Sequence, residues 1–336
     1  MDLKPTRQLD RGTSESVAAG WPVLSAAPTR EGRGTFARVL DTSSGFLILG
    51  WLVVTALLIA DVIWASASGL SFTNLTGPVY SVGLLLAIGI SYSDRYDSRL
   101  TELCNFAALW VAFSAVGSVF TYVAATMRMP LCDTALAQAD AALGYHWAGV
   151  FHFVIVHPVL RIPLAFAYWT MLPQMLASIL FFAHTGQTER NREFLAIAMV
   201  SLVITTLISG IAPAVGPYIV GHQPDFALTL LAIRSGAASV FSLNTMQGIV
   251  TMPSYHTVIA ILLIYVHRPP SRSFSIFAPL SALMLLSVSP IGNHYLSDVI
   301  AGAGVLALSI IIVNAGLKPR FLIQSNPDCS QNAAAG

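Results

Sequence analysis

Charged side chains are scarce in this sequence. Asp, Glu, Lys and Arg together make up 10% of its 336 residues, whereas about a quarter of the residues in ordinary soluble domains are charged. Hydrophobic residues make up 55%. This balance excludes an ordinary soluble domain and makes the membrane the expected environment. The formal net charge of +1 identifies no partner by itself, and we expect no nucleic acid among the partners.

Cysteine is rare as well. The three cysteines, Cys104, Cys132 and Cys329, fall in different parts of the topology derived below. We therefore expect no disulfide framework, and cysteine usage leaves the redox compartment open.

We also expect no cleavable leader. The first 44 residues are polar and contain no apolar stretch close to the start, which favours a disordered cytoplasmic tail over a signal peptide. The last twenty residues have a similar character. We therefore divide the chain into an N-terminal tail (1–44), a transmembrane catalytic domain (45–316) and a cytoplasmic C-terminal tail (317–336).

Long uncharged stretches recur along the central part of the chain. Most have about the length that a helix needs to cross a bilayer, roughly 20 residues. The sixth candidate in the list below is shorter, and it counts as a span only if the residues around His256 lie at membrane depth. The apolar runs are continuous and do not alternate, which favours helices over a β-barrel. The sequence thus predicts an all-α polytopic membrane bundle with about eight transmembrane helices. The eight candidates are about 45–67, 71–92, 104–126, 162–184, 194–214, 253–267, 274–291 and 295–316.

The basic residues are unevenly distributed across this topology. With eight spans, 14 of the 17 Lys and Arg residues fall on one side, and only Arg128, Arg161 and Arg234 fall on the other. By the positive-inside rule the richer side is cytoplasmic. We expect both termini inside, the segment from about 215 to 255 outside, and a cell (inner) membrane location.

Two histidines lie near polar partners on the predicted outer side. His256 stands in the stretch TMPSYHTVIA, at the start of an apolar segment, and His294 stands four residues before Asp298. Positions four apart share one face of a helix, so Asp298 can orient the His294 ring and raise its basicity. The simpler interpretation is that Asp298 only caps or solvates the start of the last span.

The chain crosses the membrane twice between His256 and His294, so both rings return to the same side. Two imidazoles and a carboxylate at one depth suit phosphoryl transfer, in which one ring attacks phosphorus and the other protonates the leaving oxygen. This division of roles predicts a bell-shaped pH profile, because one ring must be neutral while the other is protonated.

These motifs resemble those of the type 2 phosphatidic acid phosphatase superfamily. Pro253-Ser254-Tyr255-His256 resembles its second signature block, Pro-Ser-Gly-His, and His294 with Asp298 resembles the end of its third block. Further features resemble most closely the inositol phosphorylceramide synthase (inositolphosphotransferase) branch and its bacterial relatives. These features are Gly292-Asn293-His294-Tyr295, Asp298 to Gly302, Gly216-Pro217 and the segment from Asp133 to Gly144.

The resemblance covers about 130 to 302 and implies a six-helix phosphatase-type core. It implies a phosphatase or phosphotransferase that acts on a lipid-linked phosphate or phospholipid. His294 would be the nucleophile that forms a phosphohistidine, Asp298 its orienting acid and His256 the proton donor. Ser254 and nearby backbone amides would bind phosphate oxygens, and the motif neighbours Tyr255 and Asn293 are assigned to substrate binding. The scheme requires no metal and no cofactor.

The sequence departs from the superfamily pattern in its basic residues. The first block, a Lys and an Arg-Pro six residues further on, is missing between 194 and 252, and Val288 stands where an arginine usually precedes the third block. Phosphoryl transfer uses positive groups to stabilise phosphate oxygens. We assign Arg234, the basic residue of the outward loop before His256, as the substitute. The alternative is an arginine that only extends its charged group to the membrane interface. The loss favours head-group transfer over simple hydrolysis of a monoester.

Two other classes of function stay open at this stage. A proton-coupled transporter would use the same His and Asp residues as a relay, although paired broken helices in two related halves are not evident. A metal site would need His256, His294 and Asp298 together as ligands. Other polar residues receive structural interpretations. We expect Asp133 and Asp140 on the solvated face of an amphipathic interfacial helix, with a substrate or lid role as the alternative. We expect Tyr168 at a belt or packing position. The lipid substrate, the acceptor and the oligomeric state are not determined by the sequence.

Overall fold

Twelve helices and one pair of short strands form the part of the chain that the computed structural model describes, residues 43–93, 98–218, 224–269 and 271–317. The all-α prediction is confirmed. Nearly all of the two predicted tails, 1–44 and 317–336, lies outside the described residues. The elements are α2 (Ser43–Ser68), β1 (Ser71–Thr73), α3 (Thr76–Ser93), α4 (Ser98–Ala125), α5 (Asp133–Ala142), α6 (Trp147–Val156), α7 (Pro158–Trp169), α8 (Met171–His184), α9 (Thr188–Ile211), α10 (Asp225–Ser235), β2 (Val240–Ser242), α11 (Tyr255–Val266), α12 (Phe274–Gly292) and α13 (Leu296–Leu317).

The number of membrane-spanning helices differs from the prediction of eight. Within the described ranges, five helices are long and apolar enough to cross a membrane: α2, α4, α9, α12 and α13. A sixth span results if α6 and α7 are counted together, although they are bent by 107° at His157. Three predicted spans therefore correspond to shorter apolar elements.

The shorter elements have a physical explanation. The predicted span 162–184 is divided between α7 and α8, which meet at Thr170. The predicted span 253–267 is a helix of 12 residues, about 18 Å long at 1.5 Å per residue, against a hydrocarbon core of about 30 Å. Such a helix need not face lipid, because protein surrounds it: the side chains of Ile259, Leu262 and Leu263 are fully buried. Sequence length alone does not distinguish a buried helix from a lipid-facing one.

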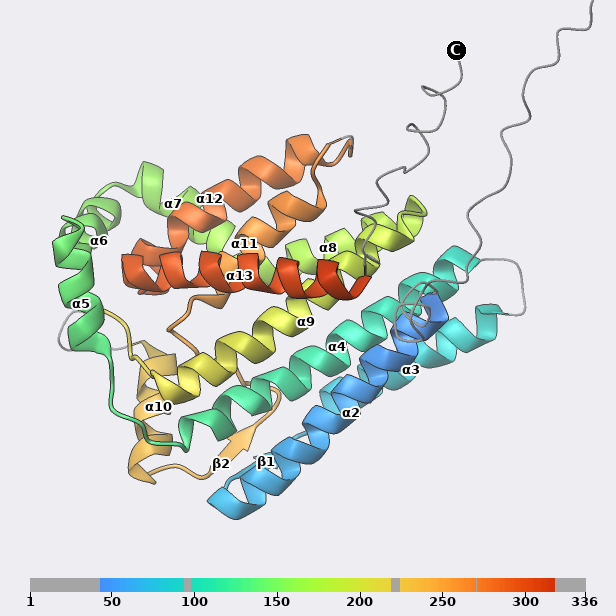
Figure 1. Cartoon of the computed structure of the whole chain (residues 1–336), viewed down its shortest axis with the longest axis horizontal. Coiled ribbons are helices and arrows are strands. Elements are labelled where there is room, and N and C mark those ends of the chain that lie inside the picture. Colours follow the sequence, from blue (N-terminus) through green and yellow to red (C-terminus); the bar gives the residue numbers. More distant parts are fainter. Residues whose placement is uncertain (1–42, 94–97, 219–223, 270, 318–336) are drawn as a thin grey trace, which may run out of the picture. The chain divides into compact units, whose positions relative to one another are not determined.

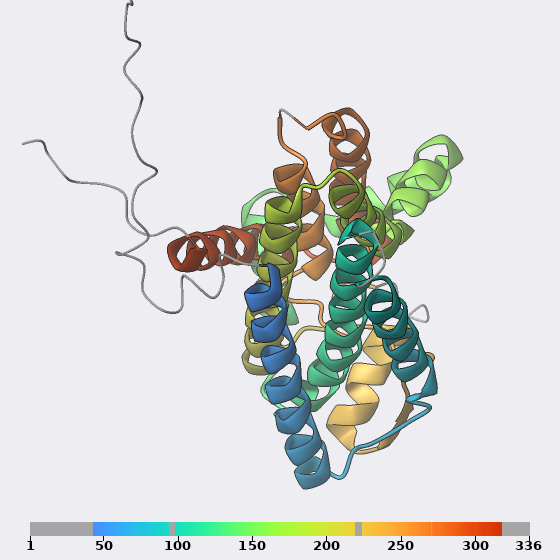
Figure 2. The same cartoon turned by 90° about the vertical axis from the view of Figure 1, so that its right-hand side faces the viewer.

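Helix α11 occupies the centre of the bundle. It packs against α8, α9, α12 and α13, and its apolar side chains join the main hydrophobic core. Helices α2, α3 and α4 run alongside one another and contact this core through the packing of α2 and α4 on α9 (Figures 1 and 2). Longer helices thus surround the central helix, and this packing holds its N-terminus in a defined position.

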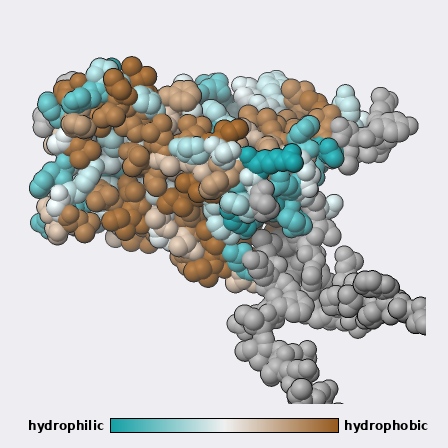
Figure 3. Space-filling view, turned by 90° about the horizontal axis from the view of Figure 1, so that it is seen from above, coloured by the Kyte–Doolittle hydropathy of each residue, from teal (hydrophilic) through white to brown (hydrophobic). Residues whose placement is uncertain are grey.

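The outer surface of the helices is strongly hydrophobic. Figure 3 shows hydrophobic residues over much of one face. On α2 alone, the exposed side chains include Ile48, Leu52, Ile59, Val62 and Ile63. Contiguous apolar surface of this kind is not stable in water and suits a lipid environment. The apolar surface and the spans together define an integral membrane protein.

The two ends of the bundle differ in their elements. Helices α5, α6 and α10 lie at one end, and the α8–α9 and α11–α12 connections lie at the other (Figure 1). At the first end the parallel strand pair β1–β2 joins Ser71 to Val240 and Thr73 to Ser242. At the second end Nη1 of Arg190 donates to the carbonyl oxygens of Val266 and Arg268. Basic residues thus gather where the helices connect at the second end.

Candidate active site

The N-terminus of α11 is fixed by Ser254. Ser254 has extended backbone angles, and its Oγ accepts a hydrogen bond from the amide of Thr257 at 3.3 Å. This is the contact of an N-cap serine, a residue type favoured at that position. The amide of Ser254 also donates to the carbonyl oxygen of Asp298 at 3.1 Å. The start of α11 is therefore tied directly to the first turn of α13.

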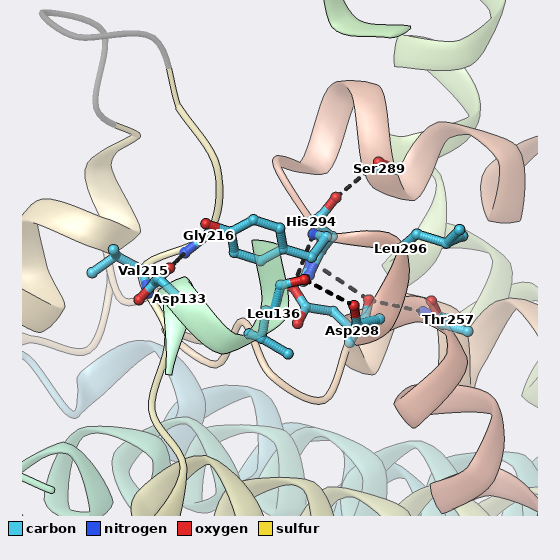
Figure 4. A network of polar contacts seen from close by, with 12 residues as sticks. Asp133, Leu136, Val215, Gly216, Thr257, Ser289, His294, Leu296 and Asp298 are labelled. Atoms are coloured by element: carbon cyan, nitrogen blue, oxygen red, sulfur yellow. Dashed lines mark hydrogen bonds and ion pairs between the residues drawn. The ribbon is translucent and has the colours of Figure 1, made fainter. Parts of the chain in front are cut away.

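The end of α12 positions His294. Asn293 adopts a left-handed conformation, with φ 57° and ψ 46°, which asparagine tolerates better than most residues. The amide of His294 then donates back to the carbonyl oxygen of Ser289 at 3.3 Å, the long bond of a Schellman motif. Oγ of Ser289 donates to the carbonyl oxygen of His294 at 2.8 Å. Figure 4 shows this contact on one side of His294 and Asp298 on the other.

The N-terminus of α13 is held by two carboxylates. Oδ2 of Asp298 accepts a hydrogen bond from the amide of Tyr295 at 3.0 Å. Asp140, which is buried and belongs to α5, accepts hydrogen bonds from the amides of Leu296 at 2.8 Å and Ser297 at 2.9 Å. Negative groups at a helix N-terminus satisfy its free amides and oppose its dipole. Helix α5 therefore fixes the turn that carries Asp298.

His294 lies between Asp298 and Ser254, and all three side chains are buried. Nδ1 of His294 is 3.4 Å from Oδ2 of Asp298. Nε2, on the opposite edge of the ring, is 3.5 Å from Oγ of Ser254. The first contact is an electrostatic one without hydrogen-bond alignment, and catalytic hydrogen bonds are often this long before a substrate binds. The predicted proximity of His294 and Asp298 is confirmed.

His256 lies at the same end of the bundle. Its ring stacks on the ring of Tyr168 in α7, with the centroids 4.2 Å apart and the planes 9° from parallel. A Cβ atom built on Gly292 would lie 2.6 Å from Cε2 of Tyr168 and 3.1 Å from Cδ2 of His294. Tyr168, which stacks on His256, and His294 therefore both lie close to the backbone of Gly292.

A cavity of about 730 Å³ opens beside His256. Its apolar wall comes from α4, α8 and α9 and includes Phe113, Met175 and Leu202. Its polar lining includes His256 and Asn293. A mostly apolar cavity with a few polar groups is the usual form of a small-molecule site. Here His256 and Asn293 are among the polar groups, and others come from α4, α10 and the segment before α11.

Asp133 stabilises the other face of the His294 turn. Its carboxylate accepts hydrogen bonds from the amides of Val215 at 3.1 Å and Gly216 at 2.9 Å (Figure 4). Gly216 has φ +79°, and a Cβ atom there would lie 2.4 Å from the carbonyl oxygen of Asn293. A side chain at Gly216 would therefore collide with the turn that carries His294.

Tyr295 lies among these acidic groups. Burial raises the pKa of Tyr295 well above its usual range, and the negative charges of Asp133, Asp298 and Asp140 raise it further. Burial also raises the pKa of Asp133, although the amide hydrogen bonds from Val215 and Gly216 oppose that shift. Tyr295 therefore stays a protonated donor toward Asp133 at neutral pH.

Three predicted substrate-binding residues make contacts of their own. Nη2 of Arg234 donates to the carbonyl oxygen of Met129 at 2.6 Å. The hydroxyl of Tyr255 donates to the carbonyl oxygen of Ala198 at 3.0 Å, and Tyr255 also lines the cavity. Asn293 supplies the left-handed turn and lines the cavity. Their substrate-binding roles stay predictions, and the contact with Met129 engages Arg234 outside the cavity lining.

Sequence reasoning missed residues that support the site. Asp133 and Asp140 were expected on a solvated face, but Asp140 is buried and both carboxylates bind backbone amides. Tyr168 was expected to pack only, but it stacks on His256. One signal was available for Asp140: Tyr295 precedes α13, and tyrosine is a poor N-cap residue, so an acceptor from elsewhere in the chain was needed.

A metal site was one of the alternatives. Among the residues with described positions, no group of three or more His, Cys, Asp or Glu side chains is arranged to hold a metal ion. His256, His294 and Asp298 therefore do not form the ligand set that this alternative required.

The fold and the site together define an α-helical integral membrane protein with two histidines and an aspartate gathered at one end of its bundle. The family model of the PAP2 superfamily matches residues 134–312, more than half of the chain, and the chain belongs to this superfamily. Members of the superfamily are phosphatases and phosphotransferases. No curated protein and no solved structure matches the chain. The predicted superfamily is confirmed, and the match does not assign a branch.

Proposed function

We propose that this protein is a membrane phosphatase or phosphotransferase that acts on a lipid-linked phosphate at the outer membrane face through a phosphohistidine on His294. The observation that supports this most directly is the position of the His294 ring. Nδ1 faces Oδ2 of Asp298 at 3.4 Å, and Nε2 faces Oγ of Ser254 at 3.5 Å. A carboxylate on one ring nitrogen leaves the other nitrogen free to act as a nucleophile.

In the first step, the lone pair on Nε2 of His294 forms a bond to phosphorus and the bond between phosphorus and the leaving oxygen breaks. The protonated ring of His256 gives its proton to that oxygen. Oγ of Ser254 and the amides at the N-terminus of α11 stabilise the phosphate oxygens, since a helix N-terminus favours anions. Asp298 balances the positive charge that develops on His294.

In the second step, an oxygen nucleophile displaces Nε2 of His294 from phosphorus. His256, now neutral, accepts the proton of that nucleophile. Water gives hydrolysis, and an alcohol gives transfer of the phosphoryl group to a new acceptor. The proton that His256 gives up in the first step is regained in the second, and the water or alcohol is the only co-reactant.

The cavity supports a lipid as the substrate. The cavity has a volume of about 730 Å³ and a mostly apolar wall, to which the candidate membrane spans α4 and α9 contribute. An acyl or isoprenoid chain fits there while the phosphate lies beside His256. Transfer of a head group, as in the inositol phosphorylceramide synthase branch, is the reaction that the absence of the superfamily's usual basic residues favours.

The outward orientation is supported by the distribution of charge. Arg99 and Arg190 lie at the end of the bundle opposite to α5 and α10, where they contact His184 and Val266 respectively. The end that is richer in basic residues is expected in the cytoplasm. The histidines lie at the other end and would then face outside.

Purified protein in lipid nanodiscs tests this function. The panel should include phosphatidic acid, an isoprenoid diphosphate and phosphatidylinositol, each with and without an alcohol or ceramide acceptor. We expect free phosphate or a new phospholipid from at least one substrate, and neither product from a folded His294→Ala variant. Equal turnover by the wild type and His294→Ala would refute the proposal.

A further inference from the structure

The proposed reaction needs positive charge near the phosphate, and the large cavity does not supply it. Its lining contains His256 but no lysine or arginine among the residues that the structure describes. Arg234, the predicted substitute, donates to the carbonyl oxygen of Met129. A phosphate in transfer carries negative charge on its three equatorial oxygens, and removing cationic partners slows such reactions strongly.

A different arginine lies beside the turn that carries His294. Arg161 of α7 lines a second cavity of about 390 Å³ together with Pro290 and Ile291 of α12. Ile291 also lines the large cavity, next to Gly292 and Asn293. Ile291 is therefore common to the linings of both cavities at the end of α12. Helix α7 packs closely on α12 (Figure 1), and it also provides Tyr168, which stacks on His256.

The surroundings of Arg161 favour an anion. Its side chain is exposed, and the other residues that line its cavity are apolar, including Phe151 and Ile155. No carbonyl or carboxylate group in the described part of the chain accepts a hydrogen bond from its guanidinium group. A guanidinium group has five N–H donors, so beside apolar residues it needs an anion or water to accept them. The guanidinium group matches phosphate oxygens in charge and in geometry.

We propose that Arg161 binds the phosphate group of the lipid substrate at the end of α12 and so supplies the positive charge that the large cavity lacks. This inference rests on the proposed function. The lipid phosphate would contact the guanidinium group on one side and face His256 and Nε2 of His294 on the other. The apolar residues around Arg161 would contact the part of the lipid next to the phosphate. Arg161 would thus take the place of the superfamily's missing basic residues, from a segment outside its signature blocks.

Substitution of Arg161 tests the inference. The variants are Arg161→Gln and Arg161→Lys. The matched control is Arg272→Gln, at an exposed position in the α11–α12 connection at the other end of the bundle. All are purified in the same nanodiscs with a lipid substrate turned over by the wild type. We expect Arg161→Gln to raise KM or lower kcat/KM by about tenfold to a hundredfold, because a charge-assisted hydrogen bond is lost. Arg161→Lys should recover part of the loss, and Arg272→Gln should stay within about twofold of the wild type.

Inhibition by vanadate separates phosphate binding from a structural role. Vanadate resembles phosphate and has no lipid chain, so an arginine that only anchors α7 at the membrane surface would leave its inhibition constant unchanged. We expect Arg161→Gln to weaken vanadate inhibition by at least about tenfold. If the wild type is active and His294→Ala is not, but Arg161→Gln keeps the wild-type KM and vanadate inhibition, this inference fails while the proposed function stands. If the wild type transfers no phosphate from any lipid, both fail.

Discussion

At the scale of single residues, the proposed reaction depends most on the ring of His294. Its two nitrogens face different partners, Oδ2 of Asp298 and Oγ of Ser254. The first contact could be predicted from the sequence, because four residues separate the pair. The contact with Ser254 joins segments 40 residues apart, and no local spacing rule predicts it. The stacking of His256 on Tyr168 could not be predicted for the same reason.

Replacing Asp298 by Asn tests the orienting role. The amide oxygen of Asn can still accept the hydrogen bond from the amide of Tyr295, so the start of α13 is preserved, but the charge that stabilises His294 is lost. We expect kcat to fall by roughly a hundredfold or more, with thermal unfolding close to that of the wild type. A variant with near wild-type kcat would show that Asp298 only caps the helix.

The pH dependence of the reaction tests the division of roles between the two histidines. His294 must be neutral to attack, so activity should fall at acid pH. His256 must be protonated to donate, so activity should also fall at alkaline pH. We expect a bell-shaped profile of kcat/KM between about pH 5 and pH 9. A flat profile over this range would contradict the assignment of attacker and proton donor.

At the scale of elements, helix α5 determines where α13 begins. Asp140 binds the amides of Leu296 and Ser297, and Asp133 binds those of Val215 and Gly216. The sequence predicted an amphipathic helix here, which was correct as an element. Its partners could not be predicted, because Asp140 and Leu296 are 156 residues apart.

Replacing Asp140 by Ala tests this support. The two amides at the start of α13 would lose their acceptor, which costs about 0.5–2 kcal/mol for a helix cap. We expect a lower melting temperature in detergent and a reduced kcat, because Asp298 is carried by the same turn. Gln138→Ala, on an exposed position of the same helix, serves as the control. Equal stability of the two variants would show that Asp140 does not support α13.

Two glycines of α13 test how closely this helix packs on α11. A Cβ atom on Gly302 would lie 2.5 Å from the carbonyl oxygen of Ser254 and 3.0 Å from Cβ of Thr257, whereas one on Gly304 would meet nothing within 4 Å. Gly302→Ala should therefore displace the start of α11 and destabilise the protein by about 1–3 kcal/mol, with a loss of activity. Gly304→Ala should be nearly neutral in both unfolding and turnover assays. Similar effects of the two substitutions would contradict the packing described here.

At the scale of the whole described unit, the sequence predicted the helical membrane class and the superfamily. Both followed from apolar runs and from short motifs around His256 and His294. The number of spans was overestimated because hydropathy does not show that α11 is enclosed by protein or that α7 and α8 are separate helices. The cavities depend on packing between distant helices, and so the place of Arg161 beside α12 became visible only in the structure.

The central claim is that Nε2 of His294 forms a bond to phosphorus, and trapping the phosphoenzyme tests it most directly. The protein is mixed with a lipid substrate that carries radiolabelled phosphate, quenched in alkali within the first turnover, and cleaved into peptides. We expect label on the peptide that contains His294, stable in alkali and labile in acid as a phosphohistidine is, and no label on the His294→Ala variant. Label on another residue, or full turnover by His294→Ala, would contradict the account.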